Sequence, residues 1–158
     1  MSFSEDEIER YARHLVLSGV GGPGQQGLKA ARVGLIGLGG VGAPAALYLA
    51  AAGVGTLRLI DDDAVSLSNL QRQIVFDTAD VGRAKVIAGS ETLAALNPHV
   101  GLEPRPERLT AANAAALIEG CDVVIDGTDD FGARFAVNAA CLACRIPLVS
   151  GALGRWSG

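Results

Sequence analysis

A glycine-rich turn after a short apolar run constrains the fold of this chain more than any other feature. Mostly apolar residues at 33–36 lead into Gly37-x-Gly39-x-x-Gly42, and an alanine-rich stretch follows to about residue 52. Glycines at this spacing let a strand turn tightly into a helix whose unpaired N–H groups face a phosphate. The pattern therefore predicts a strand–turn–helix unit that binds a nucleotide. Because NAD and ATP both carry phosphates, the turn alone leaves the nucleotide open.

Predicted strands and helices alternate through the rest of the chain. The strands cover residues 32–36, 56–60, 100–104, 122–126 and 147–150, and the helices cover 42–52, 81–96, 110–119 and 131–143. Strands that alternate with helices form a parallel sheet with right-handed crossovers. The predicted fold class is α/β, a Rossmann-like doubly wound, mainly parallel sheet in one domain over residues 1–158.

An N-terminal helical extension, residues 1–28, precedes the Rossmann-like core at 29–158. The capping box Ser4-x-x-Glu7 predicts a helix to about residue 16, with one apolar face that includes Ile8, Tyr11 and Leu15. The other face is basic and carries Arg10, Arg13 and His14; by itself it is typical of a solvated surface. Glycines and Pro23 predict a flexible loop at 19–27.

Composition argues against two classes of partner. The 158 residues carry a net charge of −4, which lacks the basic footprint of a nucleic-acid-binding protein. The acidic N-terminus does not resemble a secretory signal, and the most apolar segment, 43–54, is too short to span a bilayer. We therefore expect a cytoplasmic protein with no nucleic-acid or membrane partner.

The three cysteines do not form a recognisable zinc site. Cys141-x-x-Cys144 has the spacing of half such a site, but no second pair exists, and Cys121 stands alone. All three are expected to be reduced, buried core residues.

Polar residues after the predicted strands favour ATP over NAD. In this fold the ligand lies beyond the carboxyl ends of the strands, where Asp61 would accept ribose hydroxyls. Arg72, in Asn69-x-x-Arg72, and Lys85 supply the cations that a triphosphate requires while pyrophosphate leaves. Asp129 offers a hard oxygen ligand for Mg²⁺, although Asp129 or Asp130 could instead cap the following helix.

Taken together, these motifs resemble the ThiF/MoeB/HesA family, bacterial relatives of ubiquitin-activating enzymes, over essentially the whole chain. The most specific block is Ser68-Asn69-Leu70-x-Arg72-Gln73, preceded by Asp61-x-Asp63. The others, in the family's order, are Arg10-Tyr11-x-Arg13-His14, Gly24-Gln25-x-x-Leu28, the glycine turn, Tyr48-Leu49-Ala50-x-Ala52-Gly53-Val54-Gly55, Asp80-x-Gly82-x-x-Lys85, Asn97-Pro98, Asp126-Gly127-Thr128-Asp129 and Pro147-Leu148-Val149-x-Gly151-Ala152.

The resemblance implies ATP-dependent adenylation of a small ubiquitin-like sulfur-carrier protein at its C-terminal glycine, in molybdopterin, thiamine or related sulfur transfer. The implied catalytic residues are Arg13, Arg72, Lys85 and Asp129, with Asp129 also holding Mg²⁺. The implied nucleotide-binding residues are Gly37, Gly39, Gly40, Gly42, Asp61, Asp63, Ser68, Asn69, Leu70, Gln71, Arg72, Lys85, Asp129 and Asp130.

The resemblance further implies a homodimer in which Arg13 reaches the partner subunit's ATP. The family commonly has Asp-Asn where this chain has Asp129-Asp130, so an extra carboxylate lies beside the metal position. Members normally continue beyond the position of Gly158, and the two Cys-x-x-Cys zinc pairs of many members have no counterpart here. We therefore expect the ATP-binding part of such an enzyme, without the family's C-terminal part.

Other functions remain open at the level of sequence. An NAD(P)-dependent oxidoreductase would explain the glycine turn and Asp61 but would leave Arg72, Lys85 and Asp129 without a role. A truncated nucleotide-binding or dimerisation module would keep the pocket without catalysis. A family member that activates a carboxylate on a modified tRNA base is a close variant, which the acidic charge balance does not favour.

Overall fold

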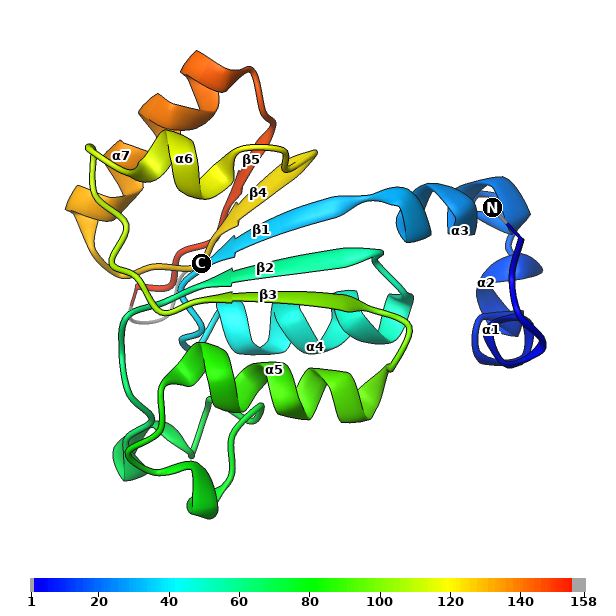
Figure 1. Cartoon of the computed structure of the whole chain (residues 1–158), viewed down its shortest axis with the longest axis horizontal. Coiled ribbons are helices and arrows are strands. Elements are labelled where there is room, and N and C mark those ends of the chain that lie inside the picture. The colour runs from blue at the N-terminus through cyan, green and yellow to red at the C-terminus, as the bar shows by residue number, and fades with distance from the viewer. Residues whose placement is uncertain (1, 155–158) are drawn as a thin grey trace.

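The computed structural model describes residues 2–154, and within them five strands form one sheet. The strands are β1 (Arg32–Ile36), β2 (Thr56–Ile60), β3 (Gly101–Arg105), β4 (Val123–Asp126) and β5 (Leu148–Ser150). Their order is β3-β2-β1-β4-β5, and every neighbouring pair is parallel (Figure 1). The predicted Rossmann-like α/β fold is therefore confirmed. Residues 1 and 155–158 of the predicted single domain lie outside the described part of the chain.

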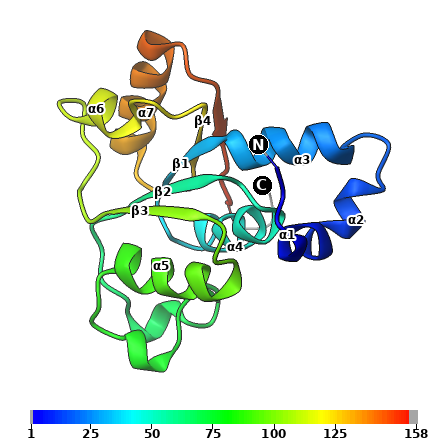
Figure 2. The ribbon, with the colours of Figure 1, turned by 45° about the vertical axis from the view of Figure 1, so that its right-hand side comes forward.

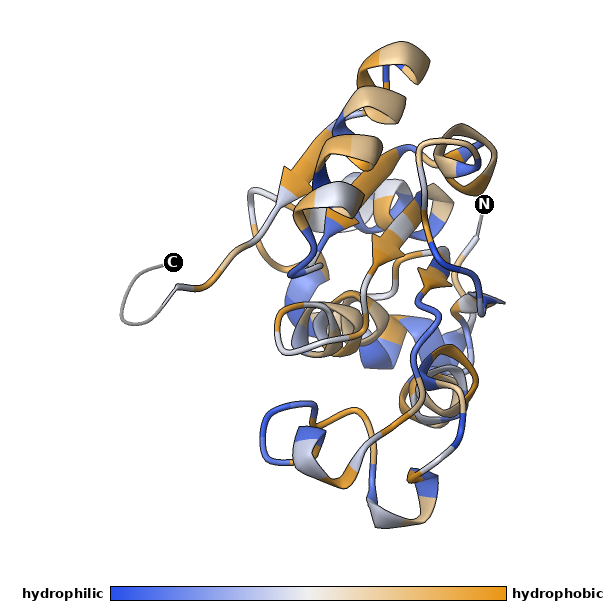
Figure 3. Ribbon diagram, turned by 90° about the vertical axis from the view of Figure 1, so that its left-hand side faces the viewer, coloured by the Kyte–Doolittle hydropathy of each residue, from blue (hydrophilic) through white to orange (hydrophobic). Residues whose placement is uncertain are grey.

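Helices cover both faces of the sheet, because alternate strand residues point to opposite sides. On one side, α4 (Gly42–Ala52) and α5 (Lys85–Leu96) pack on Leu35, Leu57 and Leu59. On the other, α6 (Ala114–Ile118) and α7 (Phe131–Cys144) pack on Ile36, Ile60 and Val124. Figure 3 shows the strands as mainly hydrophobic between these helical layers. None of the described helices has both the length and the apolar character needed to span a bilayer.

The N-terminal extension lies at the amino ends of the strands, away from the carboxyl ends (Figures 1 and 2). It contains α1 (Glu5–Arg10), α2 (Ala12–Leu15) and α3 (Gly21–Ala30). The capping box of Ser4 and Glu7 is confirmed, but the predicted single helix to residue 16 is interrupted at Tyr11. Tyr11 is buried as expected, and its hydroxyl accepts a hydrogen bond from the Asn97 side-chain amide (2.8 Å). Ile8, expected on the same apolar face, is half exposed.

The prediction of a flexible loop at 19–27 is wrong, because most of this segment belongs to helix α3. Tertiary contacts override the low helix propensity of its glycines. The Gln25 side chain is completely buried and donates from Nε2 to the Ala52 carbonyl (2.8 Å), while its Oε1 lies 2.8 Å from His14 Nδ1. These bonds fasten α3 to both α2 and the end of α4.

Two predicted helices begin later than expected. The helix predicted from residue 81 begins at Lys85 as α5, and Asp80 closes a short 3-10 turn before it, η2 (Thr78–Asp80). Gly82, with a φ of +89°, breaks the chain between them. Likewise α6 begins at Ala114 rather than at 110. A second 3-10 turn, η1 (Leu67–Asn69), lies in the segment after β2.

The expectation of three buried cysteines is only partly correct. Cys121 and Cys141 are buried in the core under α6 and α7, but Cys144 is exposed at the end of α7. Burial raises the pKa of both the Cys121 and the Cys141 thiols. Both therefore behave as neutral core side chains.

Candidate functional site

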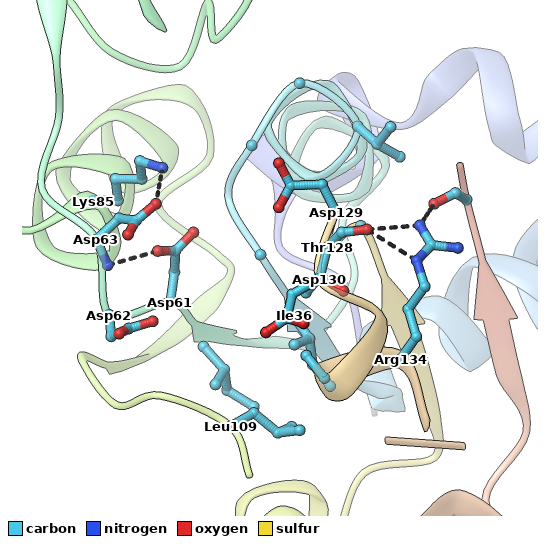
Figure 4. A pocket seen from close by; sticks show the side chains of 18 of the residues that line it. Ile36, Asp61, Asp62, Asp63, Lys85, Leu109, Thr128, Asp129, Asp130 and Arg134 are labelled. Atoms are coloured by element: carbon cyan, nitrogen blue, oxygen red, sulfur yellow. Dashed lines mark hydrogen bonds and ion pairs between the residues drawn. The ribbon is translucent and has the colours of Figure 1, made fainter. Parts of the chain in front are cut away.

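A cavity of about 650 Å³ opens where β1, β2 and β4 end (Figure 4). Its wall comes from the glycine turn, from residues 61–63 and 127–130, and from the segment after β5, together with Asn69, Arg72, Gln73, Lys85 and Arg134. Figure 4 shows Asp61, Asp63 and Lys85 on one side and Thr128, Asp129 and Arg134 on the other. The parallel sheet thus brings together segments that are far apart in the sequence.

The glycines of the turn have separate roles. Gly37 has a φ of +84°, and a Cβ there would lie 3.3 Å from the Gly127 backbone, so this position requires glycine. A Cβ on Gly42 would overlap the Gly37 carbonyl oxygen; Gly42 therefore shapes the turn and does not line the cavity. Gly39 and Gly40 border the cavity. Within the described residues, the N–H groups of Gly39, Gly40 and Val41 have no hydrogen-bond acceptor, as expected at a helix N-terminus.

Asp61 is fixed by two backbone groups at the end of β2. Leu38 N–H donates to its Oδ2 (2.6 Å), and Asp63 N–H donates to its Oδ1 (2.8 Å). Burial raises the pKa of the Asp61 carboxyl, and these two hydrogen bonds oppose that rise. The carboxylates of Asp61, Asp62 and Asp63 lie within 4.8 Å of one another. Each oxygen of Asp61 retains a lone pair for a further donor, which suits recognition of a hydroxyl.

Lys85 is a buried cation at the wall of the cavity. Its side chain is only 5% exposed, and Nζ donates to Asp63 Oδ2 (2.8 Å), a carboxylate that is 67% exposed. An ammonium group has three N–H donors, and this ion pair uses one of them. Lys85 can therefore donate to an anion in the cavity as well.

Asn69, the last residue of η1, and Arg72, shortly after it, also line the cavity. The aliphatic part of Arg72 packs over the turn, since a Cβ on Gly40 would lie 3.4 Å from Arg72 Cδ. Its guanidinium makes one long hydrogen bond, 3.4 Å to the Ser68 carbonyl. Three neighbours named by the resemblance do not line the cavity: Ser68, Leu70 and Gln71.

The two adjacent aspartates after β4 differ in environment. Asp130 caps α7, because its Oδ1 accepts from Gly132 N–H (2.8 Å), and its Oδ2 lies 3.4 Å from Arg108. The capping alternative is therefore confirmed for Asp130, although this residue also borders the cavity. Asp129 borders the cavity with an exposed carboxylate that has no hydrogen bond within the described residues.

Sequence reasoning missed the residues that hold this loop in place. Arg134 Nη2 donates to the carbonyls of Thr128 (2.6 Å) and Gly151 (2.7 Å), joining the loops after β4 and β5. Asp126 is buried and accepts from the Thr128 hydroxyl (2.7 Å) and the Ser150 hydroxyl (2.8 Å). The position of Arg134, four residues after the Asp130 cap, was the available signal that it faces the same loop.

Arg13 is the one proposed catalytic residue that the fold does not bring to the cavity. It lies on α2 with an exposed side chain and is absent from the cavity wall. Figure 1 shows α2 at the opposite end of the sheet from the carboxyl ends of the strands. Within one chain, Arg13 therefore does not contribute to this site.

Fold and cavity together define a Rossmann-like α/β protein with a cavity lined by charged side chains at the carboxyl ends of its strands. The chain belongs to the ThiF family, whose model matches residues 11–158. The resemblance inferred from the motifs is thereby confirmed.

Individual relatives share nearly half of their aligned residues with this chain. It is 47% identical over 155 residues to the molybdopterin-synthase adenylyltransferase of Escherichia coli strain K12, covering 98% of this chain and 62% of that protein. It is 45% identical over 157 residues to the probable adenylyltransferase/sulfurtransferase MoeZ of Mycobacterium tuberculosis, covering 99% of this chain and 40% of that protein. The chain thus spans less than two thirds of these relatives.

A solved structure matches the fold closely. The E. coli tRNA N6-threonylcarbamoyladenosine dehydratase TcdA, in complex with ATP, superposes with a TM-score of 0.91 at 32% identity. The match covers 98% of this chain and 64% of TcdA.

Proposed function

We propose that this chain provides the ATP-binding part of an adenylyltransferase that activates the C-terminal glycine of a small sulfur-carrier protein. The observation that carries the proposal is the buried Lys85 ammonium at the cavity wall, together with Arg72 over the glycine turn. A triphosphate needs such cations more than the pyrophosphate bridge of NAD does. The adenylyltransferase names of the relatives, and ATP in the TcdA structure, support this assignment.

The proposed reaction joins a carboxylate to AMP. The carrier's C-terminal carboxylate oxygen attacks the α-phosphorus, and the bond from that phosphorus to the β-phosphate oxygen breaks. The products are an acyl-adenylate and pyrophosphate. Asp61 would accept from the ribose hydroxyls, while Arg72 and Lys85 would neutralise the charge that develops on the departing pyrophosphate. Asn69 and the N–H groups of the turn would bind phosphate oxygens.

Asp129 fits the proposed Mg²⁺, because its carboxylate is exposed at the cavity and is not used by the fold. Hard carboxylate oxygens are the protein ligands that Mg²⁺ prefers, and a bound Mg²⁺ would neutralise phosphate oxygens. Asp130 is already used to cap α7 and pair with Arg108, so we assign it to loop structure rather than to the nucleotide.

Arg13 would act across a homodimer. Its position at the far end of the sheet excludes it from its own chain's cavity, so a role in catalysis requires a partner subunit. In the proposed enzyme, Arg13 of one subunit would contact the nucleotide of the other.

ATP–pyrophosphate exchange in the presence of a small sulfur-carrier protein tests the proposal. We expect carrier-dependent exchange, and we expect Arg72→Ala to lower it by about 10- to 100-fold, the effect of losing a charge-assisted hydrogen bond in the transition state. Arg145→Ala removes an equal charge at an exposed position outside the cavity and serves as the control. Exchange that survives Arg72→Ala unchanged, or tighter calorimetric binding of NAD⁺ than of ATP·Mg²⁺, would contradict the proposal.

A further inference from the structure

Gln73 has a buried side-chain amide that the fold does not satisfy. The residue is 3% exposed, and its Oε1 is the one buried side-chain N or O atom without a hydrogen-bond partner among the described residues. A buried polar atom without a partner destabilises the folded state, so each such atom requires an explanation.

The location of Gln73 points to the cavity. Gln73 forms part of its wall, and its Nε2 lies 4.0 Å from the position that a Cβ would take on Gly39. The backbone on either side is fixed, because Gln73 N–H donates to the Asn69 carbonyl (3.0 Å) and Phe76 N–H donates to the Gln73 carbonyl (3.2 Å). The amide is thus held at the glycine turn by its main chain, with its own polar atoms unused.

A second buried glutamine in the same chain shows the contrast. Gln25 is also completely buried, but both ends of its amide are bonded, to His14 and to the Ala52 carbonyl. Asn97, equally buried, donates to both Tyr11 and the Ala50 carbonyl. Where this fold uses a buried amide structurally, it supplies the partners. Gln73 does not follow that rule.

We infer that Gln73 is a further nucleotide-binding residue, whose amide N–H donates to a phosphate oxygen bound at the turn of Gly39 and Gly40. The inference rests on the proposed function. The free N–H groups of Gly39, Gly40 and Val41 border the same space, so the amide completes a set of neutral donors beside the cations Arg72 and Lys85. A hydrated phosphate supplies both partners that the amide lacks: an oxygen that accepts from Nε2 and a water that donates to Oε1.

The variant Gln73→Met separates this role from a structural one. Methionine preserves the length of the side chain and removes both polar atoms. We expect the free energy of unfolding of the nucleotide-free protein to stay the same or rise. We expect the Kd for ATP·Mg²⁺ from calorimetry to rise about 5- to 20-fold, as for the loss of one hydrogen bond to a charged group. The Kd for adenosine, which has no phosphate, should not change.

Two further variants provide a matched control and a second test of the inference. Gln25→Met applies the same substitution to the bonded glutamine, and we expect it to lower the free energy of unfolding. Gln73→Glu keeps the size of the side chain and adds a negative charge, so it should weaken ATP binding more than Gln73→Met does. It also provides a test if the methionine variant does not fold.

The outcomes distinguish the inference from the function on which it rests. If the wild-type chain binds ATP and each Gln73 variant binds ATP as tightly as the wild type does, Gln73 is not a ligand-binding residue and the proposed function stands. If Gln73→Met destabilises the protein as Gln25→Met does and retains ATP affinity, Gln73 is structural and satisfied by an ordered water. If the wild-type chain binds NAD⁺ in preference to ATP, the proposed function itself fails.

Discussion

At the scale of single residues, buried charges are the most informative side chains of this protein. Lys85 lines the cavity, whereas Glu7 makes contacts within the fold. Glu7 is 4% exposed, and its Oε1 lies 2.7 Å from Lys29 Nζ. Its Oε2 also accepts from Ser4 N–H (2.8 Å). These contacts, above all the hydrogen bond from Lys29, hold the pKa of the Glu7 carboxyl below its usual range. Glu7 therefore ties α1 to α3 more strongly when it is ionised than when it is neutral.

The depressed pKa of Glu7 gives a pH-dependent prediction. A carboxyl with a lowered pKa in the folded state stabilises the protein above its ordinary pKa, which is 4.5 for Glu7, and this contribution is lost as the pH falls below that value. Glu7→Gln should therefore lower the free energy of unfolding at pH 7 by about 1–3 kcal/mol. The difference from wild type should shrink at acid pH, as measured by urea unfolding at several pH values.

Glu9→Gln on the exposed side of α1 is the matched control and should have little effect at any pH. An equal deficit for Glu7→Gln at pH 7 and at acid pH would mean that the pairing with Lys29 does not contribute through charge.

At the scale of elements, glycines mark where helices end, and their surroundings decide how strictly glycine is required. Gly53 ends α4 with a φ of +81°, and a Cβ there would lie 2.4 Å from the Tyr11 ring. Gly82 has a similar φ of +89° but open space around its Cα. The two positions share a positive φ and differ in how closely other residues pack against them.

This pair predicts two different costs for the same substitution. Gly82→Ala should destabilise by about 1–2 kcal/mol, the cost of a left-handed conformation for an L-residue. Gly53→Ala should cost clearly more, because the methyl group also displaces Tyr11 from its contact with Asn97. Thermal unfolding of both variants measures the difference. Equal shifts in Tm would show that Tyr11 moves away without penalty.

Elements with a local pattern could be predicted from the sequence, and elements made by tertiary contacts could not. The strands β1 and β2 and the helix α4 have the predicted bounds, since apolar runs and glycines define them. Helix α3 is rich in glycine, a poor helix former, and is held in place by Gln25, which is bonded at both ends of its amide. The late start of α5 follows from Gly82, whose conformation a propensity argument does not reveal.

The candidate site divides in the same way. Four site residues could be predicted from the chemistry of their side chains, and the fold places all four at one cavity: Asp61, Arg72, Lys85 and Asp129. Arg134 and Gln73 contribute through geometry instead, one by joining two loops and the other by an amide without a partner. The missing hydrogen-bond partner of Gln73 cannot be seen before the chain is folded, and for Arg134 the sequence offers only its spacing of four residues from Asp130.

At the scale of the whole molecule, the distance between Arg13 and the cavity defines a test of assembly. If each active site combines Arg72 of one subunit with Arg13 of the other, then Arg13→Ala and Arg72→Ala should each lose carrier-dependent exchange. Mixing the two variants should restore it. With random pairing, half of the dimers are mixed and one site in each is intact, so about a quarter of wild-type activity should return.

The mixing experiment can be interpreted only if each variant alone has lost exchange, so the two separate assays are its internal control. Full activity of Arg13→Ala by itself would remove Arg13 from the mechanism. Two inactive variants that stay inactive after subunit exchange, verified by native mass spectrometry, would exclude a site shared between subunits.

The order of the two hydrophobic clusters along the chain has a consequence for biosynthesis. Every buried side chain of the cluster under α4 and α5 precedes residue 101, whereas the cluster under α6 and α7 draws most of its side chains from residues after 108. One face of the central strands can therefore be covered while the rest of the chain is still being translated. The other face, with Ile36 and Ile60, stays bare until α6 and α7 arrive. Nascent chains of this protein should accordingly depend on chaperones most strongly between the synthesis of β3 and that of α7.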